Sequence, residues 1–188
     1  PKRKLLYVAT GDGYSEPAEG NSDAIIAMEL KSGKRRWTRQ GLAGDVWLTA
    51  CGQNPATRSE TCPQKMGPDF DFGANPILPR MPNGKDIVIA GQKSGIAWGF
   101  DPDKRGEILW QQRVGGGSGT GGVQFGPAAD DQHGYFPTSD QGRGRDAGGL
   151  TALKLATGER VWSARPACPA EGNCAPAQSA AVTVIPGA

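Results

Sequence analysis

Residues 27–37 read Ala27-Met-Glu-Leu-Lys-Ser-Gly33-Lys-Arg-Arg-Trp37, and this pattern occurs three times in the chain. The second copy is Gly99-Phe-Asp-Pro-Asp-Lys-Arg-Gly106-Glu-Ile-Leu-Trp110, and the third is Ala152-Leu-Lys-Leu-Ala-Thr-Gly158-Glu-Arg-Val-Trp162. Each copy predicts a strand, a tight turn and a second strand. The glycine suits a turn position with positive φ. The tryptophan four residues later is expected to begin the second strand and to pack between neighbouring sheets.

Short strand-like runs fill the stretches between the copies. They are β-branched or aromatic and are bounded by turn residues, and they cover Leu5 to Ala9, Asp23 to Ala27, Asp86 to Ala90, Gly95 to Trp98 and Gly134 to Phe136. Four short strands in a unit of roughly 50 residues are typical of a β-propeller blade. The turn glycines lie 73 and then 52 residues apart, so the first interval is expected to carry an insertion, at residues 48–68.

Composition excludes several classes of protein. The 29 glycines and 15 prolines among 188 residues argue against a helical domain. A net charge of +2 without a basic cluster argues against nucleic-acid binding. No apolar run approaches the roughly 20 residues that a membrane-spanning helix needs. Because the chain begins at Pro1 and ends just after a strand-like run, both ends are expected to be cut from a longer protein.

The repeat resembles the tryptophan docking motif of the pyrroloquinoline quinone (PQQ)-dependent, or quinoprotein, alcohol dehydrogenases. Three further segments resemble the polyvinyl-alcohol-dehydrogenase-like branch, namely Ala9-Thr-Gly-Asp-Gly-Tyr14, Gly67-Pro-Asp-Phe-Asp-Phe-Gly73 and Ala90-Gly-Gln-Lys-Ser-Gly95. The resemblance implies an all-β fold, an eight-bladed β-propeller in the full-length family. Residues 1–188 would be a partial propeller domain of about three to four blades, with corners at Gly33–Trp37, Gly106–Trp110 and Gly158–Trp162.

The resemblance also implies a site that holds PQQ and Ca²⁺. Asp12 stands where the family has an asparagine that ligates calcium, and a carboxylate is equally a hard oxygen ligand. Asp45, in Gly44-Asp45-Val-Trp47, matches the proposed general base beside calcium, so we expect it to be both base and metal ligand. The family motif continues directly into Asp-x-Asp, whereas here that element appears only at Asp69-Phe-Asp71, which leaves these two aspartates as the alternative base.

Three more residues are expected to contact the cofactor. Lys93 matches the family's lysine or arginine that reaches the quinone oxygens, where a cation would stabilise negative charge that develops on reduction. Ser139 and Asp140 fall where the family has a further polar contact. The Gly-rich run at 115–122 lacks the lysine and helix of a phosphate loop, so it predicts a loop near the channel mouth rather than a nucleotide site.

Four cysteines lie in Pro-, Gly- and Asn-rich loops and fit neither zinc nor haem spacings. Local disulfides Cys51–Cys62 and Cys168–Cys174 are expected, with other pairings open. Disulfides imply an oxidising compartment, which for this family is the periplasm or the outside of the cell.

The favoured function is PQQ- and calcium-dependent oxidation of an alcohol, with electrons passed to an acceptor such as a cytochrome c. The fragment alone is expected to be inactive. The alternative is a non-catalytic propeller that serves as a scaffold for protein partners in the cell envelope, because fold alone does not decide function.

Overall fold

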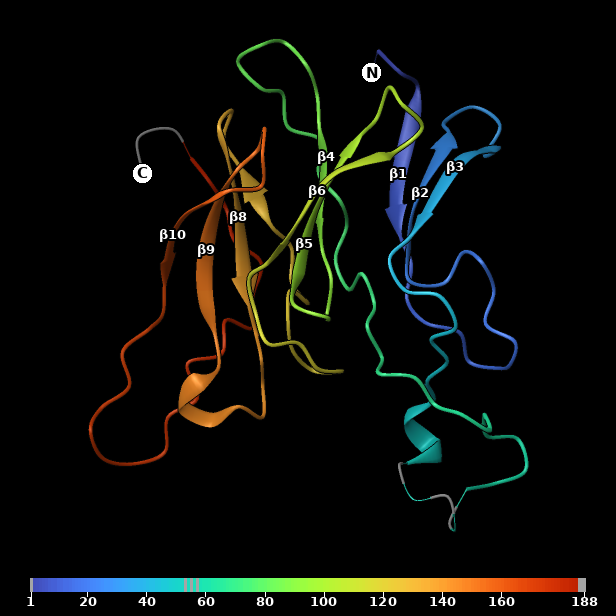
Figure 1. Cartoon of the computed structure of the whole chain (residues 1–188), viewed down its shortest axis with the longest axis vertical. Coiled ribbons are helices and arrows are strands. Elements are labelled where there is room, and N and C mark those ends of the chain that lie inside the picture. Colours follow the sequence, from blue (N-terminus) through green and yellow to red (C-terminus); the bar gives the residue numbers. More distant parts are fainter. Residues whose placement is uncertain (1, 53, 55, 57, 186–188) are drawn as a thin grey trace.

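The computed structural model describes residues 2–52, 54, 56 and 58–185. Over this part of the chain the protein is all-β, with ten strands in three antiparallel sheets, two short 3-10 helices and no α-helix (Figure 1). The helices are η1 (Thr49–Cys51) and η3 (Gly144–Asp146). The all-β prediction is confirmed.

Each sheet is an up-and-down meander of consecutive strands. The first contains β1 (Leu5–Ala9), β2 (Ala24–Glu29) and β3 (Arg35–Gln40). The second contains β4 (Val88–Gly91), β5 (Ile96–Asp101) and β6 (Glu107–Arg113). The third contains β7 (Ala128–Ala129), β8 (His133–Thr138), β9 (Gly149–Lys154) and β10 (Arg160–Ala164).

The three sheets stand side by side, the second between the first and the third (Figure 1). One apolar cluster, which includes Trp37, Phe72 and Phe100, joins the first sheet to the second. Another, which includes Trp110, Phe136 and Leu153, joins the second sheet to the third. Sheets that pack face to face in sequence order are the blades of a β-propeller, so the chain is a partial propeller.

The tryptophans of the repeat connect one blade to the next. The ring of Trp37 lies against Gly106 of the second sheet, and the ring of Trp110 lies against Gly158 of the third. A Cβ added to either glycine would come within 2.7 Å of the ring, and both glycines have positive φ. The Trp110 indole also donates a 2.8 Å hydrogen bond to the Leu155 carbonyl. Both indoles are only 7% exposed.

Trp162 differs from the other two, because its ring is 42% exposed and contacts Tyr135 of its own sheet. The described residues contain no fourth sheet on which this ring could pack. The expected packing between sheets therefore holds for two of the three tryptophans.

The tryptophans do not begin their strands, contrary to the sequence-based expectation. The strands start two or three residues earlier, directly after the turn, so that each tryptophan pairs across the sheet with the small residue that opens its repeat. The pairs are Ala27 with Trp37, Gly99 with Trp110, and Ala152 with Trp162. A Cβ on Gly99 would lie 2.3 Å from the Trp110 ring, which explains the glycine in that copy.

Residues 48–68 form a projection without a strand among their described residues, at the lower right of Figure 1. That this segment is an insertion stays a prediction, as do the limits of the propeller domain. Disulfides join Cys51 to Cys62 and Cys168 to Cys174, which confirms the expected pairing. No helix in the described part of the chain is long and apolar enough to cross a membrane.

Trp110→Ala is expected to destabilise the full-length protein by roughly 3–5 kcal/mol, because it leaves a cavity between two blades. Leu109→Ala, on the same strand but exposed, is the matched control and should cost less than about 1 kcal/mol. Urea unfolding of both variants measures the difference. Equal costs would show that the indole does not join the blades.

Candidate acidic site

Three carboxylates from two loops meet where the first two sheets adjoin. Asp12 lies in the loop after β1, whereas Asp69 and Asp71 lie in the segment that leads to β4. One oxygen from each carboxylate lies within 4.8 Å of the others. The backbone N–H of Asp12 donates a 2.8 Å hydrogen bond to Asp71, which fixes the two loops to each other.

Lys93 completes the group from the turn between β4 and β5. Its ammonium lies 2.8 Å from an oxygen of Asp69 and 2.6 Å from an oxygen of Asp71. Its side chain is nearly buried, and burial alone would lower its pKa. The hydrogen bonds to the two carboxylates outweigh burial and raise the pKa of Lys93, so the ammonium is charged.

The site carries more negative charge than Lys93 balances. Burial, followed by the charge of Asp71, raises the pKa of Asp12 to about 7. Burial also raises the pKa of Asp69, against the opposing effect of Lys93. Only the pKa of Asp71 is lowered, because hydrogen bonds from Lys93 and the Asp12 amide outweigh its burial. Such crowding favours a cation among these oxygens.

Asp45 lies beside this group but is committed to the backbone. It is buried, and its carboxylate accepts hydrogen bonds from the N–H groups of Phe70 at 2.8 Å and Asp69 at 3.3 Å. A Cβ on Gly67 would lie 2.0 Å from its Oδ1, so glycine is required for this approach. Asp45 therefore holds the loop that presents Asp69 and Asp71.

Asp140 holds a second loop in the same way. Its buried carboxylate accepts hydrogen bonds from the N–H groups of Gly116, Gly117 and Gly122, at 2.7–3.0 Å. The hydroxyl of Ser139 donates to a carbonyl of the same Gly-rich loop. This loop packs on the turn that carries Lys93, and a Cβ on Gly119 would lie 2.7 Å from Asp69. Ser139 and Asp140 thus shape the site through the loop.

Asp23 is a residue that the sequence analysis did not single out. Its side chain is 0% exposed, and neither carboxylate oxygen has a hydrogen-bond partner among the described residues. Burial and the negative charge of Asp45 raise its pKa to about 8. Its position beside a strand carries no sequence signal, since a strand-start aspartate is usually a turn residue.

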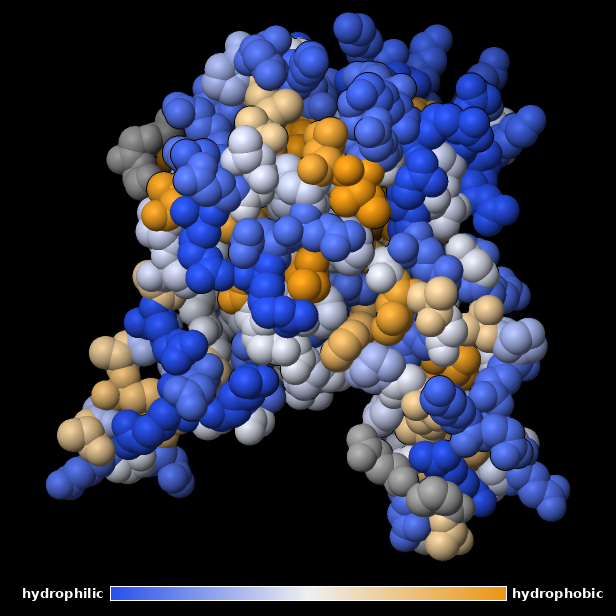
Figure 2. Space-filling model, viewed as in Figure 1, coloured by the Kyte–Doolittle hydropathy of each residue, from blue (hydrophilic) through white to orange (hydrophobic). Residues whose placement is uncertain are grey.

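A cavity of about 500 Å³ opens beside the carboxylates and is lined by residues of the loop after β1, together with Asp71. At this end of the molecule, residues 48–68 and the loops beyond β8 and β10 project on either side of an open hollow (Figure 2). The acidic group therefore adjoins space that a ligand can enter.

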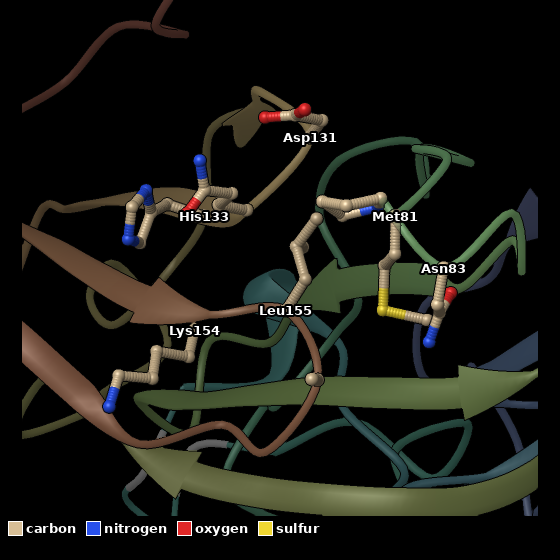
Figure 3. Close-up of a pocket in the computed structure, with 9 residues that line it drawn as sticks. Met81, Asn83, Asp131, His133, Lys154 and Leu155 are labelled. Carbon is tan, nitrogen blue, oxygen red and sulfur yellow. The ribbon is translucent and has the colours of Figure 1, made fainter.

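Another cavity, of about 320 Å³, lies between the loop at Met81, the turn before β8 and the turn after β9 (Figure 3). Its polar side chains do not converge: Lys154 pairs with Glu159 at 2.7 Å, and His133 lies 3.5 Å from Asp130. This cavity lacks the close group of charges found at the acidic site.

Two curated relatives match essentially the whole chain. Polyvinylalcohol dehydrogenase from Pseudomonas sp. is 42% identical over 192 residues, which cover 100% of this chain and 29% of that protein. The enzyme of the same name from Sphingopyxis sp. (strain 113P3) is 39% identical over 194 residues, covering 99% of this chain and 30% of that protein. The chain is a relative of the polyvinyl alcohol dehydrogenases. The expected resemblance to this branch is confirmed.

The chain spans about 30% of the length of these relatives. No family model matches it. Among solved structures, a europium-containing methanol dehydrogenase aligns at 17% identity and a TM-score of 0.48, over 86% of this chain and 23% of that one. The quinohemoprotein alcohol dehydrogenase from Comamonas testosteroni aligns at 15% identity and 0.46, over 92% and 25%. BamB from Moraxella catarrhalis aligns at 16% and 0.44, over 81% and 38%.

Asp45→Asn is expected to destabilise the full-length protein by about 1–3 kcal/mol, because an amide cannot accept from both N–H groups of the loop as a carboxylate does. Thermal unfolding measures this, with the exposed Asp131→Asn as the matched control. Unchanged stability combined with lost activity would instead identify Asp45 as a group that reacts with substrate.

Proposed function

We propose that the full-length protein to which this chain belongs oxidises an alcohol. It would bind PQQ and Ca²⁺ at the acidic site for this reaction. Polyvinyl alcohol or a related secondary alcohol is the proposed substrate, because both curated relatives are polyvinyl alcohol dehydrogenases. The observation that carries the proposal is the convergence of Asp12, Asp69 and Asp71, the last two of which pair with Lys93.

The donor set fits calcium. Ca²⁺ prefers six to eight oxygen ligands, and carboxylates are the side chains that most often supply them. Asp12, Asp69 and Asp71 offer oxygens within 4.8 Å of one another, and Oδ2 of Asp12 is buried without a hydrogen-bond partner. We assign these three residues as calcium ligands from this chain. The ligand role expected for Asp45 stays a prediction that its hydrogen bonds to the loop make less favourable.

Asp69 is the better candidate for the general base. Its backbone N–H donates to Asp45, which holds the residue in place. Its carboxylate is partly exposed, so one oxygen can receive the hydroxyl proton of an alcohol. Asp45 stays the alternative base. Bound PQQ would accept the hydride and calcium would polarise the quinone, while the protein's own residues bind the alcohol and take its proton.

Lys93 serves two purposes in this proposal. Its ammonium favours the ionised forms of Asp69 and Asp71, and it offers a positive charge to oxygens that become negative on reduction. Ser139 and Asp140 support the cofactor side of the site by holding the Gly-rich loop against the Lys93 turn. Direct contacts from these two residues to the cofactor stay a prediction.

The two disulfides support a periplasmic or secreted location. An electron acceptor such as a cytochrome c would reoxidise the cofactor. The scaffold alternative lacks a reason for crowding three partly buried carboxylates beside one ammonium that pairs with only two of them, since each costs desolvation free energy.

Asp69→Asn in the full-length, cofactor-loaded protein is expected to lower kcat for alcohol oxidation about 100-fold or more, because it removes the base. The exposed Asp131→Asn should leave kcat unchanged. Steady-state assays with an artificial electron acceptor measure both. Near-normal turnover of Asp69→Asn would move the base to Asp71 or Asp45.

Calcium is expected to stabilise the full-length protein by about 2.7 kcal/mol at a free concentration 100 times Kd. Thermal unfolding after chelation and re-addition measures this effect. The double variant Asp12→Asn/Asp71→Asn should lose the calcium-dependent increase in Tm, whereas Asp131→Asn should keep it. An equal increase in the double variant would place the ion elsewhere.

A further inference from the structure

Four arginines surround a cavity of about 380 Å³ at the boundary between the second and third sheets. They come from the ends of outer strands and from the loop after β8: Arg113 ends β6, Arg160 begins β10, Arg165 follows it, and Arg143 precedes η3. Neither the proposed oxidation nor the packing of the blades explains why these four cations share one cavity.

Two of the arginines are fixed by backbone carbonyls. Arg113 donates from Nη1 to Ser94 at 2.9 Å and to Gly115 at 3.1 Å. Arg160 donates from Nη2 to the backbone carbonyl of Arg113 at 2.6 Å, which ties its guanidinium to the end of β6 across the boundary between sheets. Each keeps further N–H groups that these bonds do not use.

The other two arginines are less committed. The guanidinium of Arg143 has no hydrogen bond or ion pair with another described residue, whereas its backbone bonds to Asp140 and Asp146. It lies so close to Gly116 that a Cβ there would be 2.3 Å from Nη1. Arg165 has one partner, Asp146, at 3.6 Å, and that carboxylate is 86% exposed. Both guanidiniums are therefore available to a ligand.

The acids that line the cavity do not neutralise it. Asp140 is committed to three backbone N–H groups of the Gly-rich loop, and Asp146 is exposed on the rim. Four guanidiniums and two carboxylates line the cavity, so positive charge is in excess there and like charges repel one another. An anion that accepts from several guanidiniums would relieve this repulsion.

We propose that this four-arginine cavity binds an oxyanion that carries two negative charges. Guanidinium groups present paired N–H donors that match the spacing of oxygens in sulfate, phosphate and carboxylate groups. Because Arg113 and Arg160 belong to adjacent blades, the bound anion bridges them. Arg113, which lines the cavity, donates to the carbonyl of Ser94, the neighbour of Lys93, but the cavity shares no described lining residue with the acidic site and takes a ligand of opposite charge.

Isothermal titration calorimetry of the full-length protein with sodium sulfate tests the proposal, with sodium chloride at matched ionic strength as the blank. We expect saturable sulfate binding. Arg143→Gln should weaken it about tenfold or more, because the variant loses a charged hydrogen bond to the anion. Arg165→Gln should weaken it similarly. Arg36→Gln, an exposed arginine on the first sheet, removes the same charge elsewhere and should leave affinity unchanged.

Titration with sodium succinate tests whether the cavity prefers a tetrahedral ion or the carboxylates of an organic diacid. Binding of sulfate without succinate indicates a free tetrahedral ion, whereas equal binding of both indicates carboxylates such as those of an organic diacid. The proposal is overturned if sulfate gives no more heat than chloride, or if Arg143→Gln and Arg165→Gln both bind sulfate as tightly as Arg36→Gln does. Unchanged Tm values would confirm that the variants are folded.

Discussion

Contact between a tryptophan ring and the corner glycine of the next sheet determines how the blades of this protein are arranged. The ring covers a glycine that has no room for a side chain, and on its own sheet it lies across from an alanine or a second glycine. Adjacent blades are therefore held at one spacing. The loops that carry Asp12, Asp71 and Lys93 can meet only because this spacing brings the strand ends together.

A second level of order comes from carboxylates that bind backbone rather than ligands. Asp45 holds the loop of Asp69, and Asp140 holds the Gly-rich loop that covers Lys93. Buried acceptors of this kind bond N–H groups that would otherwise be buried without a hydrogen-bond partner. The less buried carboxylates, in contrast, remain near a cavity and face one another.

The repeat and the strand-like runs allowed much of the fold to be predicted, because turn glycines and β-branched runs act locally. The place of Trp37 within its strand was missed, since it depends on where pairing begins. The site was harder. The choice between Asp45 and Asp69 depends on the path of residues 48–68, and the partners of Asp140 lie about 20 residues away in sequence. Asp23 gave no local signal at all.

Asp69 is held through its backbone N–H, not through its carboxylate alone. The loop's shape and the loop's chemistry therefore depend on different residues. A combinatorial library that varies Asp12 and Asp69 would sample new reactivities on an intact scaffold, whereas the same diversity at Asp45 or Gly67 would mostly yield misfolded clones. The side chains at the acidic site can thus be exchanged without redesigning the residues that support the loop.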